Sequence, residues 1–299
     1  MVKKIIGFAR LARPANLPTA AADIFAGIAL ALFSTIVGIP EFFSVNGQGI
    51  LSLVFASVFL YAGGVVFNDV FDAKLDAVER PERPIPSGLI PKNQAVIWGL
   101  LLFVFGLYLA FSVHQVSGGI AGILIFSILV YDALAKKHSF FGPLVMGICR
   151  ALNLLLGMSI LGQLDLWWVS LVPMIYIFAI TLISRGEVHG DNKNHIAIAG
   201  LLYVLVLAFI AITIALKTDH ILVSLPFIAL FGFMVFRPLL NAYRENSPQN
   251  IKKAVMAGVL SLIVMDACWV AGFTHWYLGL LVLLLLPLSL LLSRIFAVT

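Results

Sequence analysis

The chain reads as a series of long apolar runs separated by shorter polar connections. Each run is continuous and close to the ~20 residues that an α-helix needs to cross the hydrocarbon core of a bilayer. A membrane β-barrel would show short segments of alternating polarity instead. The pattern therefore predicts ten membrane helices, at residues 17–37, 50–67, 95–113, 117–135, 141–161, 166–184, 196–216, 221–240, 254–273 and 276–296.

Composition supports this interpretation. Of the 299 residues, 62% are hydrophobic and only 11% are charged. A soluble globular domain carries about 25% charged residues, so this chain has too few charges to cover a surface that faces water on all sides. We expect an all-α polytopic helical bundle surrounded by membrane lipid, forming a single domain over residues 1–299.

The distribution of basic residues predicts an orientation. If the N-terminal stretch MVKKIIGFARLAR stays in the cytoplasm, the Lys and Arg residues of the connections fall on that side, with Lys217 as the exception. This is the positive-inside pattern, so the net charge of +5 indicates topology and not a nucleic-acid partner. The small residues 19–22 precede the end of the first run, which is the reverse of the order in a cleavable signal, so we expect a retained helix.

The polar connections differ in length between the two sides. The outer connections are short, except for one expected at Gly38–Gly49, whereas the inner ones are longer and carry most of the polar residues. We therefore expect an integral multi-pass protein, in a bacterial inner membrane, with its active site facing the cytoplasm.

A weak internal repeat is also visible. A polar connection follows the second run, at 68–94, and another follows the sixth run, at 184–195. Four helices separate the two, so both emerge on the same side. We expect two halves, about 10–135 and 141–240, followed by helices within 254–296. Two such halves often enclose a central cavity, in transporters as well as in other membrane proteins.

The first polar connection begins with a cluster of acids, in FNDVFDAKLDAVERPERPIPSG. If the helix continues, Asp69, Asp72 and Asp76 are spaced i, i+3 and i+7 on one face, with Asn68 one turn before Asp72. Carboxylates at a helix C-terminus oppose the helix dipole, which argues against a merely solvated helix end. Oxygen ligands of this kind suit Mg²⁺, which binds through one or two carboxylates together with substrate phosphates.

The second connection, SRGEVHGDNKNH, places Glu187 and Asp191 at i and i+4. Alone, this segment fits an ordinary polar turn equally well. Together with the first acids on the same side, it predicts divalent ions around one diphosphate. Arg80 and Arg83, in the first polar connection, and Lys136 and Lys137, which follow Tyr131 at the end of the fourth run, can neutralise phosphate oxygens, although for Lys137 a role in topology is the favoured interpretation.

Some polar residues fall within the apolar runs, where they are costly unless they face a cavity or a partner. Arg150 and Asn153 are at i and i+3, so they share a helix face. We expect both to point into a cavity, joined by Asn16 and Asp23 from the first helix. For Asp266 a packed polar contact is the favoured interpretation.

The acidic motifs resemble those of a known family. The segment from Asn68 to Asp76 matches NDxxDxxxD, the first motif of the UbiA superfamily of intramembrane prenyltransferases, and RPIPSG at residues 83–88 resembles its continuation. The segment from Glu187 to Asp191 stands in the place of the second motif, DxxxD. The resemblance covers roughly residues 10–295. The stretches SRGEVHGDN and CRALNLLLGMS look more like the EboC-like branch than like quinone-pathway enzymes.

The chain departs from the family pattern at several positions. Glu187 stands where the family usually has Asp, which lengthens the arm that would reach a metal ion. The family's Tyr-x-x-x-Lys element appears as Tyr131 and Lys136, one residue further apart. Members usually have nine helices around a central cavity, so nine to ten are expected here.

The resemblance implies a reaction, its substrates and its site. The reaction is Mg²⁺-dependent transfer of a prenyl group from a prenyl diphosphate to a lipophilic acceptor. The implied metal ligands are Asn68, Asp69, Asp72, Asp76, Glu187 and Asp191, of which Asp69, Asp72, Asp76 and Asp191 are the catalytic candidates. The substrate-binding candidates are Asn16, Asn68, Arg83, Tyr131, Lys136, Arg150, Asn153 and Arg185.

Two alternatives remain open from the sequence. A secondary transporter could use the acids as a cation site, although it would be expected to carry them near the membrane midplane. A catalytically weakened relative could bind or move a prenylated lipid, and Glu187 in place of Asp keeps that alternative open. Product formation separates this alternative from an active transferase.

Overall fold

The computed structural model describes residues 2–33, 35, 38–187 and 190–296, and these residues form helices and turns without any strand. The helices are α1 (Val2–Leu11), α2 (Leu17–Leu32), α3 (Ile39–Glu79), α4 (Lys92–Val113), α5 (Gln115–Ala133), α6 (Phe141–Met158), α7 (Leu171–Ser184), α8 (Lys193–Lys217), α9 (Ile221–Arg244), α10 (Pro248–Phe273), α11 (Trp276–Leu283) and α12 (Leu285–Ile295). Short 3-10 turns are η1 (Pro14–Asn16), η2 (Ala135–Lys137), η3 (Ser159–Leu161) and η4 (Trp167–Ser170).

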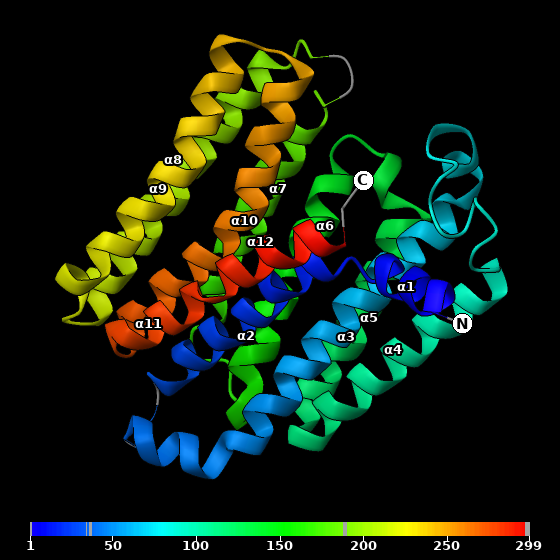
Figure 1. Ribbon diagram of the computed structural model, residues 1–299. Coiled ribbons are helices and arrows are strands. Elements are labelled where there is room, and N and C mark those ends of the chain that lie inside the picture. Colours follow the sequence, from blue (N-terminus) through cyan, green and yellow to red (C-terminus); the bar gives the residue numbers. More distant parts are fainter. Residues whose placement is uncertain (1, 34, 36–37, 188–189, 297–299) are drawn as a thin grey trace.

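The predicted all-α membrane fold is confirmed. Ten segments of the described chain are long and apolar enough to cross a membrane, and they coincide with the ten predicted runs. Figure 1 shows α8 and α9 on one flank of the bundle, α4 and α5 on the other, and α2 and α10 between them. The division into two repeated halves stays a prediction.

The prediction of an outer connection at 38–49 is wrong, because this segment is helical: α3 begins at Ile39 and continues for 41 residues. Pro40 lies in its first turn, where a missing N–H costs no helical hydrogen bond. Figure 1 shows these first turns crossing one end of the molecule before the helix turns into the bundle. At its other end α3 extends beyond the apolar run to Glu79, so the acids of the first motif are helical, as predicted.

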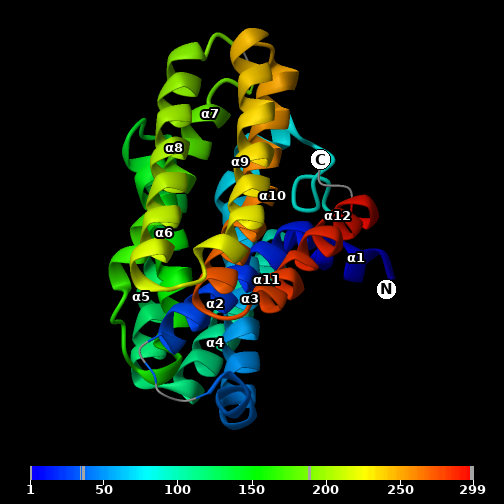
Figure 2. The same ribbon diagram turned by 90° about the vertical axis from the view of Figure 1, so that its left-hand side faces the viewer.

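The last apolar run crosses as two helices. The chain breaks at Leu284, between α11 and α12. Pro287 explains the break, because its ring lacks an N–H and clashes with the carbonyl of the residue four positions earlier. Beyond it, α12 packs on η1 and α2, where Ser289 Oγ donates a hydrogen bond to the carbonyl of Ala15 at 2.5 Å. Figure 2 shows α12 lying obliquely across this side of the bundle.

Helices α2 and α10 form the centre of the bundle. Within their most apolar windows 83% and 72% of the residues are buried, against 17% for the last span, whose apolar side chains remain on the outside. Helix α6 approaches α2 very closely: a Cβ at Gly157 would lie 2.5 Å from the carbonyl oxygen of Ile24. Small residues at such crossings allow helices to pack backbone to backbone.

Candidate active site

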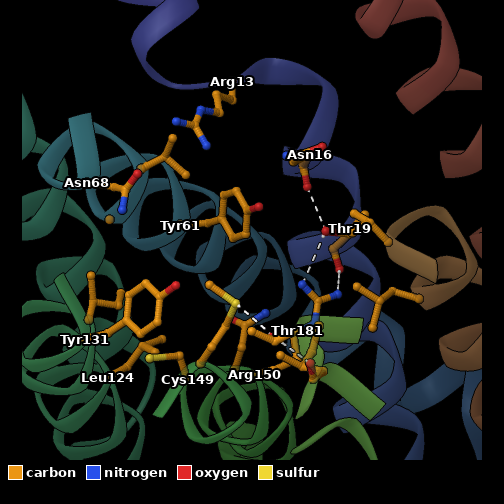
Figure 3. Close-up of a pocket in the computed structure, with 18 of the residues that line it drawn as sticks. Arg13, Asn16, Thr19, Tyr61, Asn68, Leu124, Tyr131, Cys149, Arg150 and Thr181 are labelled. Carbon is orange, nitrogen blue, oxygen red and sulfur yellow. Dashed lines mark hydrogen bonds between the residues drawn. The ribbon is translucent and has the colours of Figure 1, made fainter. Parts of the chain in front are cut away.

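A cavity of about 430 Å³ lies among α2, α3, α5, α6, α7 and α10 (Figure 3). This volume is in the range of ordinary small-molecule sites. At one end, called the mouth below, lie Arg13, Asn16, Asn68 and Asp132. Deeper in the bundle the walls are mainly apolar, formed by Leu124, Ile128, Ile177, Ile180, Val259 and Leu262.

Two acids of the first motif are buried and share one arginine. Arg83, from the loop after α3, lies 2.8 Å from Asp76 and 3.3 Å from Asp69. Arg13 contacts the same oxygen of Asp69 at 2.7 Å. Asp69 and Asp76 are only 5% and 3% exposed, so the two guanidinium groups supply most of their charge compensation.

The third acid of the motif faces a different partner. Lys136, in η2, contacts Asp72 at 2.5 Å and lies 3.8 Å from Asp132 of α5. Asp132 in turn accepts a hydrogen bond from the side-chain amide of Asn68 at 2.7 Å. The acidic motif on α3 is thereby tied to the opposite wall of the mouth.

Carboxylate and amide oxygens therefore lie at and around the mouth together with the basic side chains of Arg13, Arg83 and Lys136. Carboxylate and amide oxygens are the ligands that Mg²⁺ prefers, and arginine and lysine bind phosphate oxygens. Among the described residues, no three His, Cys, Asp or Glu side chains are placed to hold one metal ion by themselves. Since Mg²⁺ commonly takes one or two carboxylates and completes its shell with substrate phosphates and water, these donors fit an ion that arrives with a diphosphate.

The second motif lies on the loop between α7 and α8. Arg185 and Asp191 are exposed and Glu187 is half-buried; Asp191 has a left-handed backbone, with φ 52°. Burial raises the pKa of Glu187, and the positive charges of Lys252 and Arg80 oppose this shift. His189, which lies between the two acids, falls outside the described residues.

The buried side chain of Asn192 fixes the end of this loop. Its amide donates hydrogen bonds to the carbonyls of Leu182 and Ile183 at the end of α7, at 3.1 and 2.9 Å. Its backbone N–H donates to Asn246 Oδ1 at 2.9 Å, which joins the loop to the α9–α10 connection. None of Arg185, Glu187 and Asp191 lines the cavity, and a metal site shared by both motifs stays a prediction.

Arg150 and Asn153 line the cavity, as expected, and they belong to a buried polar cluster. Arg150 pairs with Asp23 through its Nε at 2.7 Å and donates to the carbonyl of Thr19 at 2.7 Å. Asn153 donates to Asp23 at 2.7 Å and to the carbonyl of Ala20 at 3.0 Å. Asp266 makes the packed polar contact expected of it, 4.0 Å from Arg150.

Five of the predicted substrate-binding residues line the cavity together: Asn16, Asn68, Tyr131, Arg150 and Asn153. Three further residues that line the cavity, Arg13, Asp132 and Tyr61, were not predicted from the sequence. Tyr61 and Tyr131 extend into the space between Asn68 and Arg150 (Figure 3). A signal for Asp132 was present, since it is an acid within an apolar run and directly follows Tyr131, whereas Arg13 was assigned only to topology.

Known proteins resemble this chain in sequence and in fold. Residues 24–256 match the model of the UbiA prenyltransferase family. A digeranylgeranylglyceryl phosphate synthase of Methanoregula boonei is 32% identical over 200 residues, 63% of this chain and 65% of the relative. The synthase of that name from Methanosarcina mazei is 37% identical over 143 residues, 48% of each chain. The matches thus span less than two thirds of these relatives.

Solved structures share the fold at low identity. A structure of a digeranylgeranylglyceryl phosphate synthase in membranes superposes with a TM-score of 0.65 and 22% identity, covering 90% of this chain and 98% of the other. A UbiA homologue from Archaeoglobus fulgidus, bound to GPP and Mg²⁺, gives a TM-score of 0.66 at 12% identity, covering 88% and 99%. The family model, which spans most of the chain, shows that this protein belongs to the UbiA prenyltransferase family.

Proposed function

We propose that this protein transfers a prenyl group from a prenyl diphosphate to a lipophilic acceptor inside the membrane, with Mg²⁺ as cofactor. One observation carries the proposal: ion pairs between acidic and basic side chains lie at the mouth of a cavity whose deeper walls are mainly apolar. An anionic head with a hydrocarbon tail matches both ends of that cavity. Membership of the family and the relative that binds GPP and Mg²⁺ support the same reaction.

Each basic residue at the mouth has a defined task in this reaction. Arg13, Arg83 and Lys136 hold the acids while no substrate is present, and they turn to the diphosphate oxygens when it binds. Bound Mg²⁺ would act as a Lewis acid that neutralises the leaving diphosphate. Asn68, Asp69, Asp72 and Asp76 are the residues that would hold it. The apolar walls keep water from the reacting carbon of the prenyl chain.

The acceptor is the finer part of the proposal. Both relatives described above are named for a glyceryl phosphate product. Glyceryl phosphate lipids are therefore the first acceptor class to screen, followed by aromatic acceptors.

The orientation of the protein in the membrane is also a proposal. We place the mouth on the cytoplasmic side, because the basic connections lie at that end. The relatives are archaeal, so the bacterial inner membrane expected from the sequence has no support from them. Assignment to the EboC-like branch stays a prediction.

The first experiment is Mg²⁺-dependent binding of a non-hydrolysable prenyl thiodiphosphate to the purified protein. We expect binding to need Mg²⁺ and to weaken at least tenfold in Asp72→Asn, since a charge-assisted contact is worth about 1.5–3 kcal/mol. Asp191→Asn should weaken it too if both motifs act on one diphosphate. Glu82→Gln, at an exposed acid of the loop after α3, is the matched control.

The outcomes separate the alternatives. Binding that ignores Mg²⁺ and both Asp substitutions contradicts the proposal and favours a transporter that uses the acids as a cation site. Mg²⁺-dependent binding without product from any acceptor in the screen favours a weakened, lipid-binding relative.

A further inference from the structure

One face of α1 packs on the loop that follows α3. Leu11 is fully buried, and it belongs to the same apolar cluster as Ile90 of that loop. A Cβ at Gly7 would lie 3.0 Å from the side chain of Leu89 and 3.1 Å from that of Ile90. Figure 2 shows α1 at the edge of the bundle. This face of the helix is therefore covered by protein, and the opposite side is free.

The free side of α1 has an apolar part and a basic part. Ile5 and Ile6 are apolar, yet they are 62% and 42% exposed. Lys3 and Arg10, spaced i and i+7, lie beside them around the helix axis, and both are exposed. Neither base takes part in an ion pair among the described residues. An exposed apolar strip beside a basic strip is typical of a helix that lies in the interface between lipid and water.

The level of α1 along the bundle agrees with such an interface. Phe8 packs edge-on against Trp98 of α4, with ring centroids 5.9 Å apart. Trp98 is six residues after Lys92, where α4 begins, and so lies about 9 Å along that helix. Tryptophan is enriched where membrane proteins cross the headgroup region. Helix α1 therefore lies at the level where the membrane surface would meet the bundle.

The position of α1 also fixes two cations of the mouth. Arg13 follows the helix by two residues and contacts Asp69 at 2.7 Å, with a left-handed backbone at φ 44°. A non-glycine residue keeps this strained conformation only where its surroundings hold it. The loop that α1 covers carries Arg83, and the N–H of Ile90 donates a hydrogen bond to the carbonyl of Pro84 at 2.9 Å, directly after that arginine. A displaced α1 would release both guanidinium groups.

We propose that α1 binds anionic lipid headgroups at the membrane surface, and that this binding holds Arg13 and Arg83 at the mouth. The basic side chains of Lys3 and Arg10 contact headgroup phosphates, and the two exposed isoleucines enter the layer below. The lipid composition around the protein thereby regulates its affinity for the donor. This regulation rests on the proposed function, whereas the binding of α1 to lipid does not.

The depth of a spin label at residue 5 tests the binding to lipid. The label is attached in Ile5→Cys, in a background without the two native cysteines. In nanodiscs of phosphatidylglycerol, we expect oxygen to reach the label better than a water-soluble nickel reagent does. In phosphatidylcholine the label should lie closer to water, because each basic side chain favours binding to an anionic surface about fivefold. Equal depth in both lipids, or nickel access equal to that of a label in Glu82→Cys, overturns the proposal.

Donor affinity in the same two lipids tests the regulation. In phosphatidylglycerol, Lys3→Gln/Arg10→Gln should bind the prenyl thiodiphosphate at least fivefold more weakly than the unmodified protein, since the apparent affinity follows the fraction of molecules with a formed mouth. In phosphatidylcholine the two proteins should bind alike. Comparison within one lipid cancels the repulsion between an anionic surface and an anionic donor. No loss in phosphatidylglycerol, or an equal loss in both lipids, overturns the regulation.

A matched control removes two exposed bases elsewhere. Arg244→Gln/Lys253→Gln, at the α9–α10 connection, should bind the donor like the unmodified protein in both lipids. A loss in this control equal to that in Lys3→Gln/Arg10→Gln would show an effect of net charge alone and overturn the regulation. Failure of the proposed function looks different, because the unmodified protein would then bind no donor in either lipid, while the label at residue 5 would still report its depth.

Discussion

At the scale of single residues, the mouth is organised by cations that come from outside the acidic motif. Arg13 precedes η1, Arg83 follows α3 and Lys136 belongs to η2, yet all three meet carboxylates of one helix face. Four carboxylates, those of the first motif and Asp132, face these three cations. The mouth thus stays close to neutral before substrate arrives, although it holds several buried charges.

Arg83 gives a direct test of this charge balance. In Arg83→Gln the buried carboxylates of Asp69 and Asp76 lose their shared partner, so we expect the free energy of unfolding to fall by about 3 kcal/mol. Mg²⁺ should restore part of the loss, because a divalent ion can replace the missing positive charge. Thermal unfolding in detergent, with and without Mg²⁺, measures both effects. Arg80→Gln, at an exposed arginine of the same loop, should change neither.

At the scale of elements, the close crossing of α2 and α6 holds the polar cluster together. Gly157 leaves room for the carbonyl of Ile24, and Gly27 leaves room for the backbone near Leu154. The crossing brings Asp23 of one helix against Arg150 and Asn153 of the other. A wider separation would break these contacts before it affected the lipid-facing helices.

A side chain at this crossing should therefore be poorly tolerated. We expect Gly157→Ala to lower the free energy of unfolding by about 1–3 kcal/mol, because the added Cβ meets backbone that cannot move aside. Gly122→Ala is the control, since a Cβ there has no neighbour within 4 Å. Comparison of the two melting temperatures checks the prediction; equal values would contradict it.

At the scale of the whole molecule, the ten candidate membrane segments of the described chain predict that residues 2 and 296 lie on one side of the membrane, with the mouth. To test this orientation, single cysteines are placed at Glu82, beside the mouth, and at Asp219, in the α8–α9 connection, in a background without Cys149 and Cys268. In intact cells we expect a membrane-impermeant maleimide to label the cysteine at 219 and to spare the one at 82. The reverse labelling pattern would place the mouth on the outer side.

The sequence was sufficient for the features that follow local periodicity. The apolar runs located all ten membrane segments, and the spacing of Asp69, Asp72 and Asp76 predicted a helical motif. The start of α3 was missed, because Glu41, Asn46 and two glycines interrupt the apolar pattern there and are typical of a connection.

Pairings across the fold were not predictable in the same way. The contact of Arg13 with Asp69 joins residues 56 positions apart, and that of Asn68 with Asp132 joins residues 64 apart. No periodicity within either segment encodes such a partner. Polarity alone was enough to place Arg150 and Asn153 at a cavity, because charged and amide groups within the membrane have few other places to lie.

The hydrogen bond from Ser289 to Ala15 joins positions 274 residues apart. It bears on the order of events during synthesis. The segment that carries Arg13 leaves the ribosome long before α12, the helix that packs on η1 after the break at Leu284. The contact of α12 with η1, which carries Asn16 of the mouth, can therefore form only after all the spans between them have been inserted.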